Sequence, residues 1–121
     1  MKKVDIHMDF PLPSNCLYIN NTNRNEIFRE TDHPLAFYDL TDDEQKELLS
    51  WCGNLEKIKN INTEFSSYGL KHFFERSSNG FYINNGAFKG AMIICGFLVG
   101  DISKLNWDFN ISQKSINKIR K

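Results

Sequence analysis

Residues 63–97 read TEFSSYGLKHFFERSSNGFYINNGAFKGAMIICGF, and this stretch decides the fold. Ser66 and Ser67 are good helix N-caps, and the apolar side chains that follow fall near helical spacing, so a helix is expected there. The polar SSNG segment at 77–80 is expected to end it. The next run, 81–83, is short, aromatic and β-branched, which predicts a strand.

A second helix is expected after the Asn-Asn-Gly turn at 84–86, because either asparagine can cap it. Its apolar face recurs at i, i+3, i+4 and i+7 and consists of Phe88, Ala91, Met92 and Cys95. Gly96 is expected to end this helix. Two helices with a short connection have the outline of a helix-turn-helix DNA reader. The connection here is longer than in that motif, so a plain packed helix pair is the alternative.

The clearest helix start of the chain lies upstream of this unit. Thr41 and Glu44 have the spacing of a capping box, and Leu40 stands where a hydrophobic staple would. Leu48, Leu49 and Cys52 give the helix an apolar face, and Gly53 is a plausible end. Residues 54–62 either continue the helix or form a loop.

Alternation of apolar and polar side chains predicts the strands. It is strict over 4–10, and 16–19 can pair with that segment in a hairpin. Further strands are expected at 97–99 and at 107–111, where Trp107, Phe109 and Ile111 alternate with Asp108 and Asn110. Ser112 is expected to cap a last short helix with its lysines and its arginine facing out.

The expected fold is therefore α+β, with three to four short helices packed against a small, mostly antiparallel sheet. A chain of 121 residues with 40% hydrophobic residues suffices for one domain. Within it, 1–33 is expected to be a β-rich arm, 34–111 the core and 112–121 a basic tail.

Composition also limits the compartment and the chemistry. The three cysteines are odd in number and have no CxxC spacing, which argues against a disulfide framework. No apolar run approaches the roughly 18 residues of a membrane helix. The first ten residues carry charges where a signal peptide needs an apolar stretch, so a cytoplasmic protein of a bacterial cell is expected.

Charge is unevenly distributed although its sum is zero. Residues 1–69 contain seven Lys or Arg and twelve Asp or Glu, a balance of −5, whereas 70–121 contain eight and three, a balance of +5. Such asymmetry is typical of a nucleic-acid-binding face. It equally fits two halves that attract each other, within one chain or across a dimer.

Several short motifs share a pattern with known proteins. They are SSYGLKH at 66–72, GFYI at 80–83, NG at 85–86, FKGAM at 88–92, GF at 96–97 and NWDFN at 106–110. Over about 34–111 the chain resembles a group of small proteins carried by bacteriophages and integrated mobile elements. Most members have no assigned activity, so the resemblance implies a bacterial mobile-element context and no catalytic residues.

Signatures of enzymes and of metal sites are weak in this sequence. His7, His33 and His72 lack the local spacing of metal ligands, and there is no phosphate-binding loop. Cys95 and His72 would form a nucleophile and base only if the fold joined them. The glycine-containing segment 86–90 opens a helix, and its amides suit an anion only weakly. We therefore expect neither an enzyme nor a cofactor.

The leading hypothesis is nucleic-acid binding through the basic C-terminal half. The residues expected to contact phosphate are Lys71, His72, Arg76, Lys89, Lys114, Lys118, Arg120 and Lys121. Tyr68 and Tyr82 are candidates for stacking on bases, with packing as the alternative for both.

A second hypothesis is an inhibitor of a host defence system, such as an anti-CRISPR protein that binds a nuclease complex by protein–protein contact. Its acidic partner surface would consist of Asp39, Asp42, Asp43, Glu44 and Glu47. These side chains equally fit an ordinary solvated first turn of a helix. A third hypothesis is an assembly protein whose oppositely charged halves pair in a homodimer.

Overall fold

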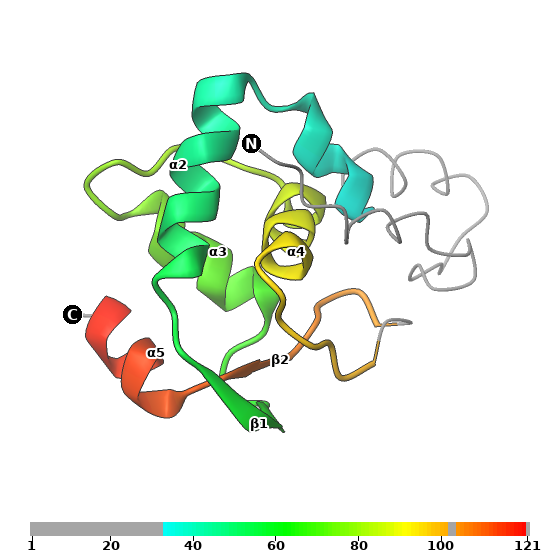
Figure 1. Cartoon of the computed structure of the whole chain (residues 1–121), viewed down its shortest axis with the longest axis vertical. Coiled ribbons are helices and arrows are strands. Elements are labelled where there is room, and N and C mark those ends of the chain that lie inside the picture. Colours follow the sequence, from blue (N-terminus) through cyan, green and yellow to red (C-terminus); the bar gives the residue numbers. More distant parts are fainter. Residues whose placement is uncertain (1–32, 102–103, 121) are drawn as a thin grey trace.

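The computed structural model describes residues 33–101 and 104–120, which fold as a mixed α+β unit (Figure 1). In order, its elements are the 3-10 helix η4 (Pro34–Asp39), α2 (Asp42–Gly53), β1 (Lys57–Asn62), α3 (Ser67–Glu75), α4 (Asn85–Ile94), β2 (Phe109–Ile111) and α5 (Gln113–Ile119). The two strands of this part form an antiparallel sheet. The predicted fold class is confirmed, whereas the expected hairpin of 4–19 lies outside the described residues.

Helices α2, α4 and α5 begin where side chains satisfy free backbone amides, whereas Ser66, at the N-cap position of α3, forms no such side-chain bond. At α2 the capping box is complete, because the Glu44 amide donates to Thr41 Oγ1 at 3.1 Å and the Thr41 amide donates to Glu44 Oε1 at 3.0 Å. At α4 the Asn84 side chain accepts from the Ala87 amide at 2.8 Å. Ser112 caps α5 in the same way. Each bond satisfies one of the orphan donors of a helix start.

Helix α4 ends in a Schellman turn at Gly96, as predicted. The Gly96 amide donates to the Ile93 carbonyl at 2.9 Å, and the Phe97 amide donates to the Met92 carbonyl at 3.0 Å. Gly96 has a φ of 91°, a conformation that glycine adopts without the steric cost of a Cβ. The turn sends the chain from the core helix towards β2.

Helix α4 (yellow in Figure 1) lies at the centre of the structure, in contact with η4, α2 and α3. All of its residues from 86 to 92 are buried. A recognition helix needs an exposed face that enters a DNA groove, and α4 has none over these residues. The helix-turn-helix expectation is therefore wrong, and the packed helix pair describes α3 and α4.

The sheet joins a segment before α3 to one after α4. Lys57 pairs with Ile111 and Asn62 with Phe109, with a register irregularity between these pairs. Strand β1 lies within residues 54–62, for which the sequence predicted either a continued helix or a loop. Its first four residues are exposed and its composition is mostly polar, so it lacks the buried apolar side chains by which a strand is usually predicted. Strand β2 lies within the predicted segment 107–111.

Two predicted strands are absent from the described structure. Residues 81–83 form no ladder, because they lie along α3, where the Ile83 amide donates to Glu75 Oε2 at 3.2 Å. Residues 97–99 contribute only an isolated bridge between Val99 and Phe109. Both segments carry the side chains of strands, but their backbone groups find other partners.

Asn110 departs from the alternation predicted for its strand. It is buried, and its side chain joins two segments that flank β2. Its Oδ1 accepts from the Leu98 amide at 2.7 Å, and its Nδ2 donates to the Ile58 carbonyl at 2.8 Å. A buried amide with both ends bonded avoids the cost of unsatisfied polar burial.

We predict that Gly90→Ala lowers the free energy of unfolding by about 1–3 kcal/mol. A Cβ on Gly90 would collide with the Pro34 carbonyl oxygen and approach the Phe37 Cβ to 2.7 Å, so η4 and α4 would separate. Gly53→Ala is the matched control, because its added Cβ meets no heavy atom within 4 Å. Urea denaturation of both variants checks this. Equal stabilities would contradict the close approach of η4 and α4.

Candidate functional site

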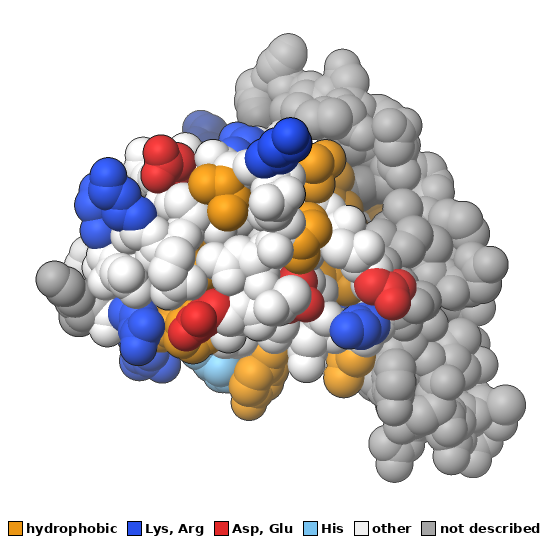
Figure 2. Space-filling model, turned by 90° about the horizontal axis from the view of Figure 1, so that it is seen from below, with side chains coloured by type: hydrophobic (Ala, Val, Ile, Leu, Met, Phe, Trp, Pro, Cys, Tyr) orange, Lys and Arg blue, Asp and Glu red, His pale blue; other side chains and the backbone are white. Residues whose placement is uncertain are grey.

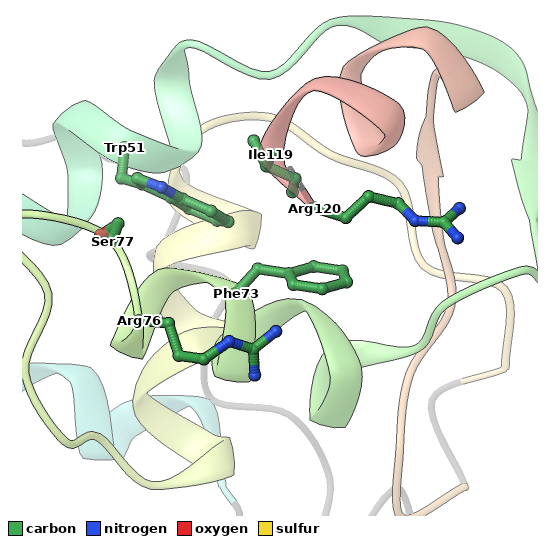
Figure 3. A pocket seen from close by; sticks show the side chains of 6 residues that line it. All are labelled: Trp51, Phe73, Arg76, Ser77, Ile119 and Arg120. Carbon is green, nitrogen blue, oxygen red and sulfur yellow. The ribbon is translucent and has the colours of Figure 1, made fainter.

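A groove of about 270 Å³ opens between the ends of α3 and α5, beside α2 (Figure 3). It is lined by Trp51, Phe73, Arg76, Ser77, Ile119 and Arg120, and we call it the arginine groove. Two of the predicted phosphate-binding residues, Arg76 and Arg120, thus line the same groove although they are far apart in the sequence, with Phe73 between them (Figure 3). No aspartate or glutamate is among the lining residues.

Aromatic rings hold both arginines. The guanidinium carbon of Arg76 lies 5.3 Å from the centre of the Phe73 ring, and that of Arg120 lies 5.4 Å from the centre of the Phe65 ring. The two phenylalanine rings contact each other edge to face, with centroids 5.2 Å apart. Cation–π contacts orient a guanidinium without neutralising its charge. Both arginines therefore stay available to an anion.

Both arginines are also the C-cap residues of their helices, Arg76 of α3 and Arg120 of α5. A positive charge at a helix C-terminus interacts favourably with the helix dipole. The sequence favours cations at these ends for this local reason, and tertiary packing then brings the two ends together.

Helix α5 is fixed to the rest of the chain by a polar clamp at its start. The Glu56 amide donates to Ser115 Oγ at 2.8 Å, and the Ser112 amide donates to the Glu56 carbonyl at 2.8 Å. On its inner side Ile116 is buried in the core. The wall of the arginine groove that carries Arg120 is therefore anchored to the sheet.

A second hollow, of about 320 Å³, adjoins the first and shares Trp51 and Ile119 with it. It is lined by Trp51, Asn54, Leu55, Ser115, Lys118 and Ile119. Lys118 thus lies on the other side of the Trp51–Ile119 boundary from the two arginines. Figure 2 shows Lys and Arg side chains on the side where α5 lies, together with hydrophobic side chains and some Asp or Glu side chains.

The cations around these hollows are exposed and form no ion pair with another described side chain. Arg76, Lys118 and Arg120 are all exposed, and none forms an ion pair in residues 33–101 and 104–120. Lys114 is exposed on the same helix as Lys118. Lys121 lies outside the described residues. The end of α3 and the outer face of α5 together present the free positive charge of this region.

Two predicted phosphate-binding lysines are buried instead, which corrects the sequence-based expectation. Lys71 is only 6% exposed, and its Nζ donates to Glu75 Oε2 at 3.0 Å. Lys89 is only 1% exposed on the central helix α4, and its Nζ lies 4.5 Å from the centre of the Trp107 ring. Both side chains are almost wholly buried, so they are poorly placed to contact phosphate in this structure.

Glu75 organises the outer side of α3, and sequence reasoning gave it no role. Its carboxylate accepts from Lys71 and from the Ile83 amide, and its Oε1 lies 2.9 Å from His72 Nδ1. Partial burial alone would raise the pKa of Glu75. The hydrogen bonds from Lys71, Ile83 and His72 and the charge of Lys71 outweigh this, so its pKa lies below the usual value. In the sequence, the spacing of Glu75 from His72 (i+3) and from Lys71 (i+4) is the signal that predicts these helix-surface contacts.

The acidic residues predicted as an alternative surface belong to the end of η4 and the start of α2. Asp39, Asp42 and Asp43 are exposed, whereas Glu44 and Glu47 are half-buried. Glu44 is engaged in the capping box. Three of the five lie in the first turn of α2, where negative charge stabilises the helix dipole. Their placement fits the capping interpretation.

The hypothetical pair of Cys95 and His72 is not formed. His72 contacts Glu75, and the Cys95 thiol donates to the Leu49 carbonyl, with Sγ and O 3.6 Å apart. Burial raises the pKa of Cys95 to about 11, so the thiol stays protonated at neutral pH. Burial likewise raises the pKa of Cys52 well above its ordinary value. A protonated, buried thiol is a poor nucleophile.

The described part of the chain has neither a cluster of metal-ligating side chains nor a helix that could span a membrane. There, no three His, Cys, Asp or Glu side chains gather in a way that holds a metal ion. No helix of this part combines the length and apolarity needed to cross a membrane.

Comparison of the chain with models of known protein families, with curated proteins and with solved structures finds no significant match. The resemblance of 34–111 to proteins of mobile elements therefore stays a prediction.

We predict that Glu75→Gln lowers the free energy of unfolding by about 2 kcal/mol at pH 7, since it weakens hydrogen bonds to a charged group. Because the pKa of Glu75 is lowered in the folded state, its carboxylate stabilises the fold above the ordinary value of 4.5. This contribution is lost as the pH falls through the lower, folded pKa. Denaturation at pH 7 and pH 3 should show that the gap between wild type and variant narrows in acid.

Proposed function

We propose that this protein is a non-enzymatic nucleic-acid-binding protein that contacts the phosphate backbone at the arginine groove. The observation that carries the proposal is the convergence of Arg76 and Arg120, from the ends of two helices, on a groove without acidic lining residues. Lys118, in the adjoining hollow, adds a third exposed cation. The expected mobile-element context is compatible with such a role.

Guanidinium groups suit this task. A planar guanidinium presents parallel N–H donors that match two phosphate oxygens, and it stays charged at any physiological pH. Here the Phe65–Phe73 pair holds both guanidinium groups at the surface. Such contacts supply affinity and salt dependence, with little choice of sequence.

The site differs from the one predicted from the sequence. Lys71 and Lys89 are not among the proposed phosphate contacts because they are buried. His72 stays next to the site, half-buried against Glu75. Lys114 contributes to the positive field of α5 from an exposed position. The proposed contact set is therefore Arg76, Lys118 and Arg120.

A second candidate function is inhibition of a host defence complex through protein–protein contact. The observation that favours it is the exposure of Asp39, Asp42 and Asp43, none of which forms an ion pair with another described side chain. Co-purification of a host complex that survives nuclease treatment, and that is lost on reversal of these three charges, would support this function over the first.

We predict that the double variant Arg76→Glu/Arg120→Glu weakens nucleic-acid binding and lowers the slope of log K against log salt by about 2, because two phosphate contacts are lost. Fluorescence anisotropy with labelled duplex DNA, single-stranded DNA and RNA over a salt series measures both quantities. The matched control is Lys46→Glu/Lys59→Glu, which makes the same charge change at exposed positions outside both hollows.

The binding experiment with the two double variants has three outcomes that decide between the hypotheses. Loss in the arginine variant alone supports the groove as the site. Equal loss in both double variants would mean that only net charge matters, which contradicts the assignment. Absence of wild-type binding at low salt would refute the proposed function and direct the search to a protein partner.

A further inference from the structure

Two exposed tyrosines flank one buried ammonium group beside the arginine groove. Tyr68 on α3 is 55% exposed, and Tyr82, in the loop after α3, is 77% exposed. The Nζ of Lys71 lies 5.9 Å from the centre of the Tyr68 ring and 5.2 Å from that of Tyr82. We call these three residues the tyrosine platform. Both rings lie near the same cation, and both are more than half exposed to solvent.

The platform is held in place by the Glu75 carboxylate. Glu75 fixes the Lys71 ammonium at 3.0 Å, and it binds the backbone amide of Ile83, the neighbour of Tyr82. Lys71 therefore has its charge balanced by Glu75 and acts on the rings by cation–π attraction. A preorganised ring loses little conformational entropy when a ligand stacks on it.

The platform is continuous with the arginine groove along one ridge of α3. Tyr68, His72 and Arg76 follow each other at intervals of four residues, so they lie on the same side of the helix. At 1.5 Å per residue the ridge spans about 12 Å. The rings of Tyr68 and His72 contact each other edge to face, with centroids 4.5 Å apart. Aromatic surface thus leads directly to the guanidinium groups.

We infer that the ligand is single-stranded nucleic acid, with unpaired bases stacked on Tyr68 and Tyr82 and its backbone directed to Arg76 and Arg120. This inference rests on the proposed function and names its substrate class. A positively charged track beside exposed aromatic rings is the usual arrangement of single-strand binders, because every base has a face that stacks. In a duplex the bases are paired and stacked on each other, so the platform discriminates against it.

The test compares Tyr68→Ala/Tyr82→Ala with Tyr68→Phe/Tyr82→Phe, which keeps the rings and removes only the hydroxyls. Stacking on an aromatic ring changes single-strand affinity by about tenfold per base. We expect the alanine variant to lose at least this factor for a single-stranded oligonucleotide and to keep its affinity for a duplex of the same length. The phenylalanine variant should bind both like the wild type.

A second binding measurement uses an abasic oligonucleotide, which has the same backbone but no bases. It should bind the wild type as weakly as the normal strand binds the alanine variant, and the two losses should not add, because both remove the same stacking. Thermal unfolding of each variant shows whether the fold is retained. Variants of Tyr82 alone serve if the Tyr68 change unfolds the protein.

The outcomes separate this inference from the proposed function. If the alanine variant and the abasic strand both bind like their references while Arg76→Glu/Arg120→Glu still weakens binding, the platform is refuted and the groove stands. If the phenylalanine variant fails as the alanine variant does, the hydroxyls act and stacking is refuted. If the wild type binds no nucleic acid, both proposals fall, and a protein partner becomes the occupant to test.

Discussion

The structure depends on the burial of α4. Over residues 86–92 this helix is enclosed, and η4 approaches it so closely at Gly90 that a Cβ would collide with the Pro34 carbonyl. A small domain has room for one such central helix, because each side of it must be covered by another element. Helices α2 and α3 and the short η4 supply that cover. Binding surfaces are therefore confined to the outer sides of the covering elements and of α5.

Local signals in the sequence were sufficient to place the helix ends. Thr41, Asn84 and Ser112 cap helices, and Gly96 ends one, because each of these effects involves atoms only a few residues apart. The strands were harder to predict. Strand β1 is mostly exposed and polar, and its identity depends on pairing with a segment about fifty residues later. Conversely, 81–83 has the composition of a strand, yet its Ile83 amide is taken by a side chain.

The site was predictable only in part, for a similar reason. The charge balance located the cations in the C-terminal half, but helical spacing alone did not show which faces would be covered. Lys71 is covered by the loop that carries Tyr82, and Lys89 by the segment that carries Trp107. Arg76 and Arg120 line the same groove because the β1–β2 pair and the Ser115 clamp place α5 next to α3. None of these contacts is local in the sequence.

The burial of two lysines changes what the charge asymmetry means. A basic half suggests a broad positive surface, but two of its lysines are buried and make contacts inside the fold. Lys71 is balanced by Glu75, and Lys89 lies against Trp107. Four exposed cations of this half, Arg76, Lys114, Lys118 and Arg120, lie at the end of α3 and on α5. In this arrangement Glu75 balances the charge of Lys71 and also binds the Ile83 amide, next to Tyr82. The outer side of α3 thus presents exposed tyrosine rings around a neutralised lysine, and the end of α3 presents an exposed arginine. The proposed function assigns bases to the rings and phosphates to the arginine.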